Sequence, residues 1–77
     1  MNTYNGHKNY AYWNVALWLA NDEGLYNMAR DHLRQARTKD EAARNIVQDL
    51  ADCGITKTPD GARYSISAVR AGIVGFE

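Results

Sequence analysis

The side chains best suited to nucleophilic catalysis are one cysteine, Cys53, and two histidines, His7 and His32. A thiol becomes a good nucleophile when a neighbouring base, often imidazole, takes its proton. No spacing in the sequence brings either histidine to Cys53, and His32 lies in mid-helix between Asp31 and Leu33. Cys53 ends an apolar helical pattern, so we expect it to be a small buried hydrophobe. The sequence therefore predicts no catalytic residues and no enzyme activity.

The sequence does not indicate a metal or cofactor site either. The histidines and carboxylates lie on separate elements without a ligand spacing, whereas metal sites gather three or four such groups. Asp22 and Glu23 are adjacent, so on a helix their side chains point in different directions and do not act as a pair. Their place at a helix start favours capping instead. We expect neither a metal ion nor a cofactor.

A row of basic side chains is the feature that could bind phosphate groups. Arg30, Arg34 and Arg37 are spaced by four and three residues on the outer side of an expected helix, and Lys39 extends the row. Such a row can follow a nucleic-acid backbone. Acidic residues interrupt it, and nine Lys and Arg balance nine Asp and Glu, so the chain has no overall basic field. The row is therefore either a nucleic-acid-binding surface or a solvated helix face with local ion pairs.

Aromatic residues are concentrated near the start of the chain, where both tryptophans and four of the five tyrosines lie between Tyr4 and Tyr26. Trp13 and Leu17 are expected in the core, but so small a core cannot easily hold every ring. Other rings are expected to stay partly exposed, where Tyr, Trp and Arg anchor protein–protein contacts. The expected partner-binding residues are Tyr4, Tyr10, Tyr12, Trp18, Arg30 and Arg34. Alternatively, the residues before the first helix fold back over the bundle and have no further role.

The hydrophobic pattern predicts an all-α fold. A chain of 77 residues, 45% of them hydrophobic, suffices for one core only, so residues 1–77 are expected to form a single helical domain. From Tyr10 the apolar spacing is helical, and Asn9 is a suitable N-cap. Asn14 is the main polar residue on this helix, and a helix that is apolar on most sides is usually central. Residues 10–20 are therefore expected to form the central helix.

A second helix is expected over residues 23–36. Asn21 can cap it, while Asp22 and Glu23 place negative charge beside its positive end. Its inward-facing residues are expected to be Leu25, Met28, Ala29, Leu33 and Ala36.

A third helix, over residues 39–53, has the clearest limits. Thr38 and Glu41 form a capping box at its start. Gly54 ends it, because glycine adopts the left-handed conformation at the lowest cost. The expected apolar stripe is Ala42, Ile46, Val47, Leu50 and Cys53.

The last part of the chain is expected to be a loop followed by a fourth helix. Pro59 and Asp60 predict a turn in the loop. Residues 65–73 fit a helix capped at Ser65 or Ser67, although residues 62–67 alone alternate like a short strand. Because one strand has no partner, we expect a compact bundle of three to four short helices, over about 10–20, 23–36, 39–53 and 65–73.

No membrane segment is expected. No apolar run approaches the roughly 20 residues that cross a bilayer. The start, Met1-Asn2-Thr3, lacks the basic region of a signal peptide. The expected location is therefore the cytoplasm.

Two segments carry a recognisable pattern. Residues 4–26, about 30% of the chain, follow YNGxxNYxxWNVxLWLxNDEGLY, and a second part comprises Thr58–Ser65 and Ala68–Ala71. Together they resemble a family of small proteins carried by phages, prophages and plasmids. That family is largely of unknown function, so the resemblance implies a genomic setting rather than a mechanism.

The genomic setting favours one class of function. Small proteins of mobile elements are often inhibitors of host defence, including anti-CRISPR and antirestriction proteins, which cover a surface of the defence complex. The resemblance therefore implies an inhibitor in the host cytoplasm. We expect an anti-CRISPR that binds a type I effector (Cascade-like) complex and blocks target DNA binding or nuclease recruitment by occlusion.

Two other functions stay open. One is a small nucleic-acid-binding accessory or regulatory protein that uses the row Arg30, Arg34, Arg37 and Lys39. The other is an accessory phage protein that acts through self-association. A surface that mimics DNA is not favoured, because the net charge is zero and phosphate mimics are usually strongly acidic.

Overall fold

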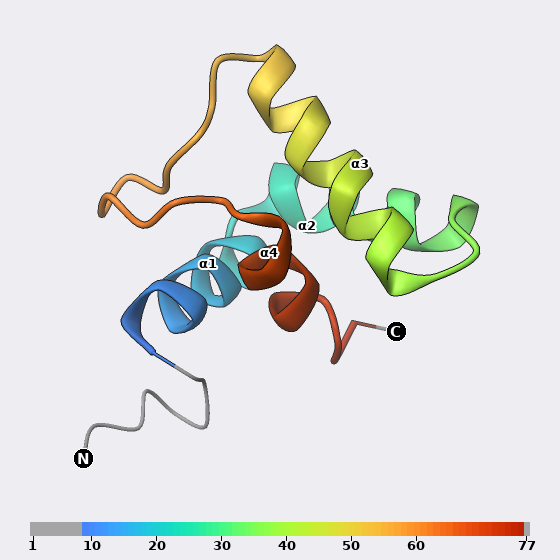
Figure 1. Ribbon diagram of the computed structural model, residues 1–77, viewed down its shortest axis with the longest axis horizontal. Coiled ribbons are helices and arrows are strands. Elements are labelled where there is room, and N and C mark those ends of the chain that lie inside the picture. Colours follow the sequence, from blue (N-terminus) through green and yellow to red (C-terminus); the bar gives the residue numbers. More distant parts are fainter. Residues whose placement is uncertain (1–8, 77) are drawn as a thin grey trace.

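The computed structural model describes residues 9–76, which form four helices (Figure 1). They are α1 (Tyr10–Asn21), α2 (Glu23–Gln35), α3 (Lys39–Asp52) and α4 (Ile66–Gly72). The described residues contain no strand, only an isolated antiparallel bridge between Lys57 and Arg63. The all-α class is therefore confirmed, and each expected helix agrees with the observed one to within a residue at either end.

The helices form a ring. Helix α1 packs against α2 and α4, and α3 packs against the same two helices, whereas the backbones of α1 and α3 are not in contact. Figure 1 shows the chain between α3 and α4 running along the outside before it returns toward α1. None of residues 11–19 is exposed, as expected for a helix that is apolar on most sides.

Side-chain caps fix where the first two helices begin. The Tyr12 N–H donates to Asn9 Oδ1 over 3.0 Å, which confirms the expected cap of α1. The Leu25 N–H donates to Asp22 Oδ1 over 3.0 Å, so Asp22 rather than Asn21 caps α2. The expected cap was wrong because α1 continues through Asn21, and Asp22 alone has the extended backbone that a cap requires.

The third and fourth helices begin in the same way. The Glu41 N–H donates to Thr38 Oγ1 over 3.1 Å. Glu41 Oε1 accepts a bond from the Arg37 N–H over 3.1 Å, one residue before the position that a capping box uses. The Ala68 N–H donates to Ser65 Oγ over 3.1 Å, so the fourth helix starts at the first of the two expected serines.

The end of α3 is closed by a Schellman motif. The Ile55 N–H donates to the Leu50 carbonyl over 2.8 Å and the Gly54 N–H to the Ala51 carbonyl over 2.9 Å, with φ of 78° at Gly54. Cys53 is exposed, so its expected burial is wrong. The reason is that the end of α3 extends beyond its neighbours, and every residue from 51 to 57 is exposed.

The core is made by one side of each helix. Its largest fully buried apolar side chains are Val15 and Leu19 of α1, Ile46 of α3, and Val69 and Ile73 at α4. On α2, the five residues expected to face inward are buried or packed against this core. The stripe of α3 also includes Ala43, which the periodicity did not single out.

Trp13 and Leu17 are half-buried and line a groove on the surface, so their expected place in the core is wrong. Helix α1 has two apolar arcs, and only one of them can face the centre of the ring. Val15 and Leu19 belong to the arc that does. Helical spacing alone cannot choose between two apolar arcs of one helix.

A buried polar network fastens the loop between α3 and α4 to α1. We call it the Asn14 network. The Asn14 amide accepts a hydrogen bond from the Thr58 hydroxyl and donates to Asp60 Oδ2 over 2.9 Å, while Trp18 Nε1 donates to the same oxygen over 3.1 Å. The Ala62 N–H donates to the Thr58 hydroxyl oxygen over 3.0 Å. Asn14 and Thr58 are only 1% and 4% exposed, so these bonds replace bonds to water.

The turn in this loop confirms the sequence expectation. The Gly61 N–H donates to the Thr58 carbonyl over 2.9 Å, which places Pro59 and Asp60 at the centre of a β-turn. Gly61 has a φ of 95°, in the region that favours glycine. The turn therefore directs the Asp60 carboxylate toward α1.

Replacing Asn14 by alanine tests the network. We expect Asn14→Ala to lower the free energy of unfolding by about 1–3 kcal/mol, because the buried Thr58 hydroxyl loses its acceptor. Urea unfolding followed by circular dichroism measures the loss. Asn45→Ala, an exposed position on α3, is the matched control and should change stability by less than about 0.5 kcal/mol. Equal effects of the two substitutions would contradict a structural role for the network.

Candidate binding surfaces

Three basic residues expected from the sequence line one pocket, which we call the basic pocket. Arg30, Arg34 and Lys39 surround a volume of 270 Å³ together with Leu33 and Phe76. Helix α2 supplies the two arginines, α3 begins with the lysine, and the chain after α4 supplies the phenylalanine. The pocket therefore joins three segments, and its cations face an aromatic and an aliphatic side chain.

Aromatic contacts hold Arg30 in place. Its guanidinium carbon lies 5.7 Å from the centre of the Tyr26 ring, a distance at which a cation is attracted to the ring face. The Tyr26 and Phe76 rings are in turn 5.0 Å apart with an interplanar angle of 50°. This arrangement orders the guanidinium before any partner arrives, so less conformational entropy is lost on binding.

The Arg34 side chain is held in place less firmly than that of Arg30. Its Nη2 donates to Asp31 Oδ1 over 2.8 Å, but the two side chains are 64% and 61% exposed. Such exposed ion pairs contribute at most about 1 kcal/mol. Arg34 can therefore exchange Asp31 for an anionic group of a partner at little cost. Arg37, the remaining member of the expected row, is exposed and does not line the pocket.

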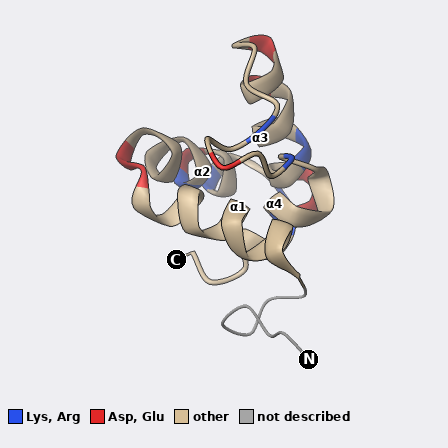
Figure 2. Cartoon of the chain, turned by 90° about the vertical axis from the view of Figure 1, so that its left-hand side faces the viewer, with Lys and Arg blue, Asp and Glu red and all other residues tan. Residues whose placement is uncertain are grey.

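A second surface, the apolar groove, runs between α1 and the end of the chain. It has a volume of 550 Å³ and is lined by Trp13, Ala16, Leu17, Ala20, Ala71, Gly72, Val74, Gly75 and Phe76. In Figure 2 the ribbon of α1 is tan along its length, because this helix has no charged residue. The helices approach closely, since a Cβ atom on Gly72 would lie 3.2 Å from Ala16 Cα.

Phe76 connects the apolar groove with the basic pocket, because it lines both. The two hollows therefore adjoin each other at this side chain, and we treat them together as one candidate binding surface. Sequence reasoning missed Phe76, although it continues the helical spacing of Val69 and Ile73 by three further residues. The exposed Tyr10 lies near this surface, with its ring 5.8 Å from that of Trp13.

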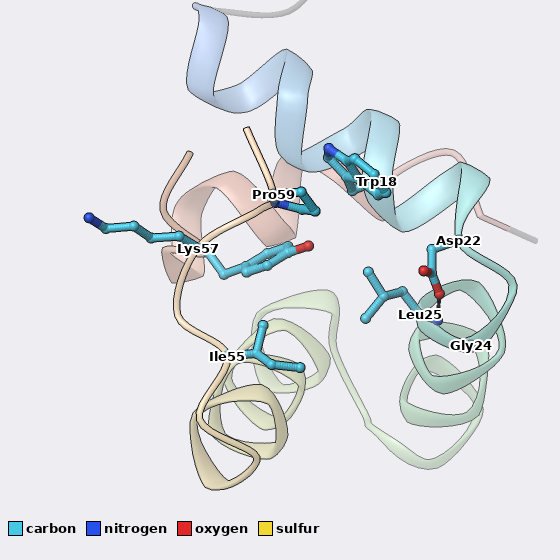
Figure 3. A pocket seen from close by; sticks show the side chains of 8 residues that line it. Trp18, Asp22, Gly24, Leu25, Ile55, Lys57 and Pro59 are labelled. Carbon is cyan, nitrogen blue, oxygen red and sulfur yellow. Dashed lines mark hydrogen bonds between the residues drawn. The ribbon is translucent and has the colours of Figure 1, made fainter. Parts of the chain in front are cut away.

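A third hollow, the Trp18 pocket, lies where the loop after α3 returns to α1 (Figure 3). It has a volume of 460 Å³ and is lined by Trp18, Asp22, Gly24, Leu25, Ile55, Lys57, Pro59 and Tyr64. Burial and the negative charge of Asp22 raise the pKa of the Tyr64 phenol above its usual 10.0, since both disfavour the phenolate. No local pattern could predict this pocket, because the two groups of lining residues, 18–25 and 55–64, are at least 30 residues apart in the sequence.

The expected partner-binding residues do not all meet. Arg30 and Arg34 share the basic pocket, whereas Trp18 lines a pocket of its own. Tyr12 packs against the core, and Tyr4 lies outside the described residues. Residues 9–76 contain no group of three or more His, Cys, Asp or Glu side chains that could hold a metal ion. None of their helices has the length and apolar character needed to cross a membrane.

A comparison with protein families gives one match. The model of a family of unknown function, DUF7249, matches residues 1–74. The chain belongs to this family. The part that matches DUF7249 includes the whole Asn14 network, both arginines of the basic pocket and all of the Trp18 pocket, and it ends two residues before Phe76. No curated protein and no solved structure matches the chain.

The Asp60 carboxylate makes stability depend on pH in the acid range. Hydrogen bonds from Asn14 and then Trp18 lower the pKa of Asp60 below its usual 3.8, because they stabilise the charged form. A carboxyl group with a lowered folded-state pKa contributes stability above the unfolded-state value, and this contribution is lost as the pH falls through the folded-state value.

Asp60→Asn removes this titration. We expect the difference in free energy of unfolding between the natural protein and the variant to be largest near neutral pH and to shrink as the pH falls below 3.8. Urea unfolding of both proteins across this range measures the difference. A difference that does not change with pH would show that the charge on Asp60 has no part in stability.

Proposed function

We propose that the protein is a mobile-element inhibitor of host defence. In this proposal it is an anti-CRISPR that binds a type I effector (Cascade-like) complex in the host cytoplasm and blocks target DNA binding or nuclease recruitment by occlusion. The observation that carries the proposal is that the apolar groove and the basic pocket adjoin each other at Phe76 and so offer one candidate binding surface. Tyr, Trp and Arg dominate protein–protein hot spots. The lining presents Trp13, Arg30 and Arg34, and the ring of the exposed Tyr10 lies beside that of Trp13. The sequence resemblance supplies the mobile-element setting.

The two halves of the surface have different tasks. The apolar groove, with Trp13 and Leu17, would bury apolar area on the effector and exclude water around the contact. Arg30, Arg34 and Lys39 would bind acidic side chains of the effector through charge-assisted hydrogen bonds. Neither task needs a catalytic group, since an inhibitor of this kind acts by covering a surface.

Charge reversal tests the arginines of this surface. We expect Arg30→Glu with Arg34→Glu to abolish inhibition without unfolding the domain, because the partner-facing end becomes repulsive. The measurement is phage plaquing efficiency on hosts with defined, targeting type I systems. The matched control, Arg44→Glu with Arg63→Glu, makes the same charge change at exposed positions outside the basic pocket and should keep inhibition. Inhibition by the folded Arg30 and Arg34 double variant would refute this interface.

The same plaquing assay with the natural protein tests the anti-CRISPR proposal itself. Restored plaquing on one type I subtype is the expected result, and it identifies the complex to purify for binding studies. If the folded protein restores plaquing on none of the subtypes, the anti-CRISPR proposal is refuted.

A second candidate is a small nucleic-acid-binding protein. It is favoured by the placement of Arg30, Arg34 and Lys39 around Phe76, because such a pocket can take a phosphate beside a stacked base. It predicts that the logarithm of the affinity for single-stranded nucleic acid falls with the logarithm of salt concentration, with a slope of about −2 for three phosphate contacts. Lys39→Gln should make the slope shallower by about 0.7. Absence of binding to free nucleic acid would reject this candidate and is what the inhibitor proposal expects.

A further inference from the structure

The Trp18 pocket shares no lining residue with the apolar groove or the basic pocket, so the proposed interface does not account for it. We infer that this pocket binds the side chain of an arginine on a protein partner. The inference goes beyond the proposed function, because it concerns a separate site and does not depend on which complex the protein inhibits.

The shape of the pocket suits one long side chain. Trp18 and Leu25 form one wall, and Ile55 and Pro59 on the returning loop form the other (Figure 3). Its volume of 460 Å³ lies within the roughly 300–1,000 Å³ of sites that hold small ligands. Ile55 is 41% exposed at this site, and a protein partner, which has surface around its arginine, would cover this apolar side chain more fully than a small molecule would.

The charges at the pocket favour a cation. Asp22 is part of the lining, and its capping bond to the Leu25 N–H uses Oδ1 only, which leaves Oδ2 for a ligand. A second carboxylate, that of Asp60, does not line the pocket but accepts the bond from Trp18 Nε1, so it lies next to the indole of the lining. Lys57 is the one cation of the lining, and Figure 3 shows its ammonium group directed away from the cavity.

The partial charges at the end of α1 and the start of α2 do not change the net charge at the pocket. Helix α1 ends and α2 begins at Asp22, so the partial negative charge of one end and the partial positive charge of the other offset each other. The negative charge of the pocket lining is therefore that of the Asp22 carboxylate.

Arginine fits these features better than other side chains. Its aliphatic stem can pack against Leu25, Ile55 and Pro59 while its charged group stays near the opening. A guanidinium group is planar and weakly hydrated, so it stacks on an aromatic face such as that of the half-buried Trp18 and donates to a carboxylate at the same time. A neutral apolar side chain would cover the Asp22 carboxylate without forming a hydrogen bond or an ion pair with it.

The test is an NMR titration of the full chain with a blocked arginine, N-acetyl-arginine methylamide. The neutral analogue N-acetyl-citrulline methylamide has nearly the same shape and serves as the comparison. We expect the arginine probe to give a saturable shift of the Trp18 indole N–H signal, with the Trp13 indole as an internal reference, and the citrulline probe to give much weaker binding. Equal binding of the two probes would overturn the inference.

Asp22→Asn tests the carboxylate without removing the helix cap, because asparagine caps helices as well as aspartate does. We expect this variant to bind the arginine probe about fivefold more weakly, near the upper limit for an exposed ion pair. Asp52→Asn, an exposed position on α3, makes the same charge change outside the pocket and should leave the affinity unchanged. Unchanged affinity of a folded Asp22→Asn variant would overturn the inference.

Each result can be separated from the proposed function. The titration uses the isolated protein, so it decides the pocket whatever the plaquing assay gives. If Asp22→Asn did not fold, the comparison of arginine with citrulline on the natural protein would still decide the inference.

Discussion

The buried amide of Asn14 is the interaction on which the rest of the structure depends. An amide on an otherwise apolar helix is costly to bury unless both of its groups are bonded. Thr58 donates to its oxygen and Asp60 accepts from its nitrogen, so the loop after α3 has to return to α1. This return brings Pro59 opposite Trp18, which creates a pocket between segments that are otherwise far apart in the chain.

Helix α1 organises the molecule because its sides have different neighbours. Val15 and Leu19 face the core, and Trp18 faces the loop that the polar network holds. Leu17 lies on a further side, beside the groove that α4 completes. The close approach at Gly72 means that a side chain there would press against Ala16 and Leu19, so glycine lets α4 pack tightly against α1 beside the groove. One helix thus supplies a wall to two separate surfaces, and the core holds both in place.

The helices could be predicted from the sequence because their signals are local. Asn9, Thr38, Ser65 and Gly54 act where the residue types indicated, since a cap depends on neighbours within a few positions.

The surfaces could be predicted only in part. The pairing of Arg30 with Arg34 followed from helical spacing, whereas Arg37 of the expected row does not line the basic pocket. Phe76 and the Trp18 pocket could not be predicted, because both depend on how segments distant in sequence pack. The wrong expectations for Trp13, Leu17 and Cys53 have the same origin, since burial is decided by neighbours that periodicity does not reveal.

The exposed position of Cys53 has a practical consequence. It is the chain's single cysteine, so a thiol-reactive fluorophore attaches at one known point without any substitution. Cys53 lies two residues before Ile55, which lines the Trp18 pocket. Cys53 itself lines neither the apolar groove nor the basic pocket. The fluorescence of a dye at this position should therefore respond to a macromolecule that covers the Trp18 pocket more than to one that covers the apolar groove or the basic pocket.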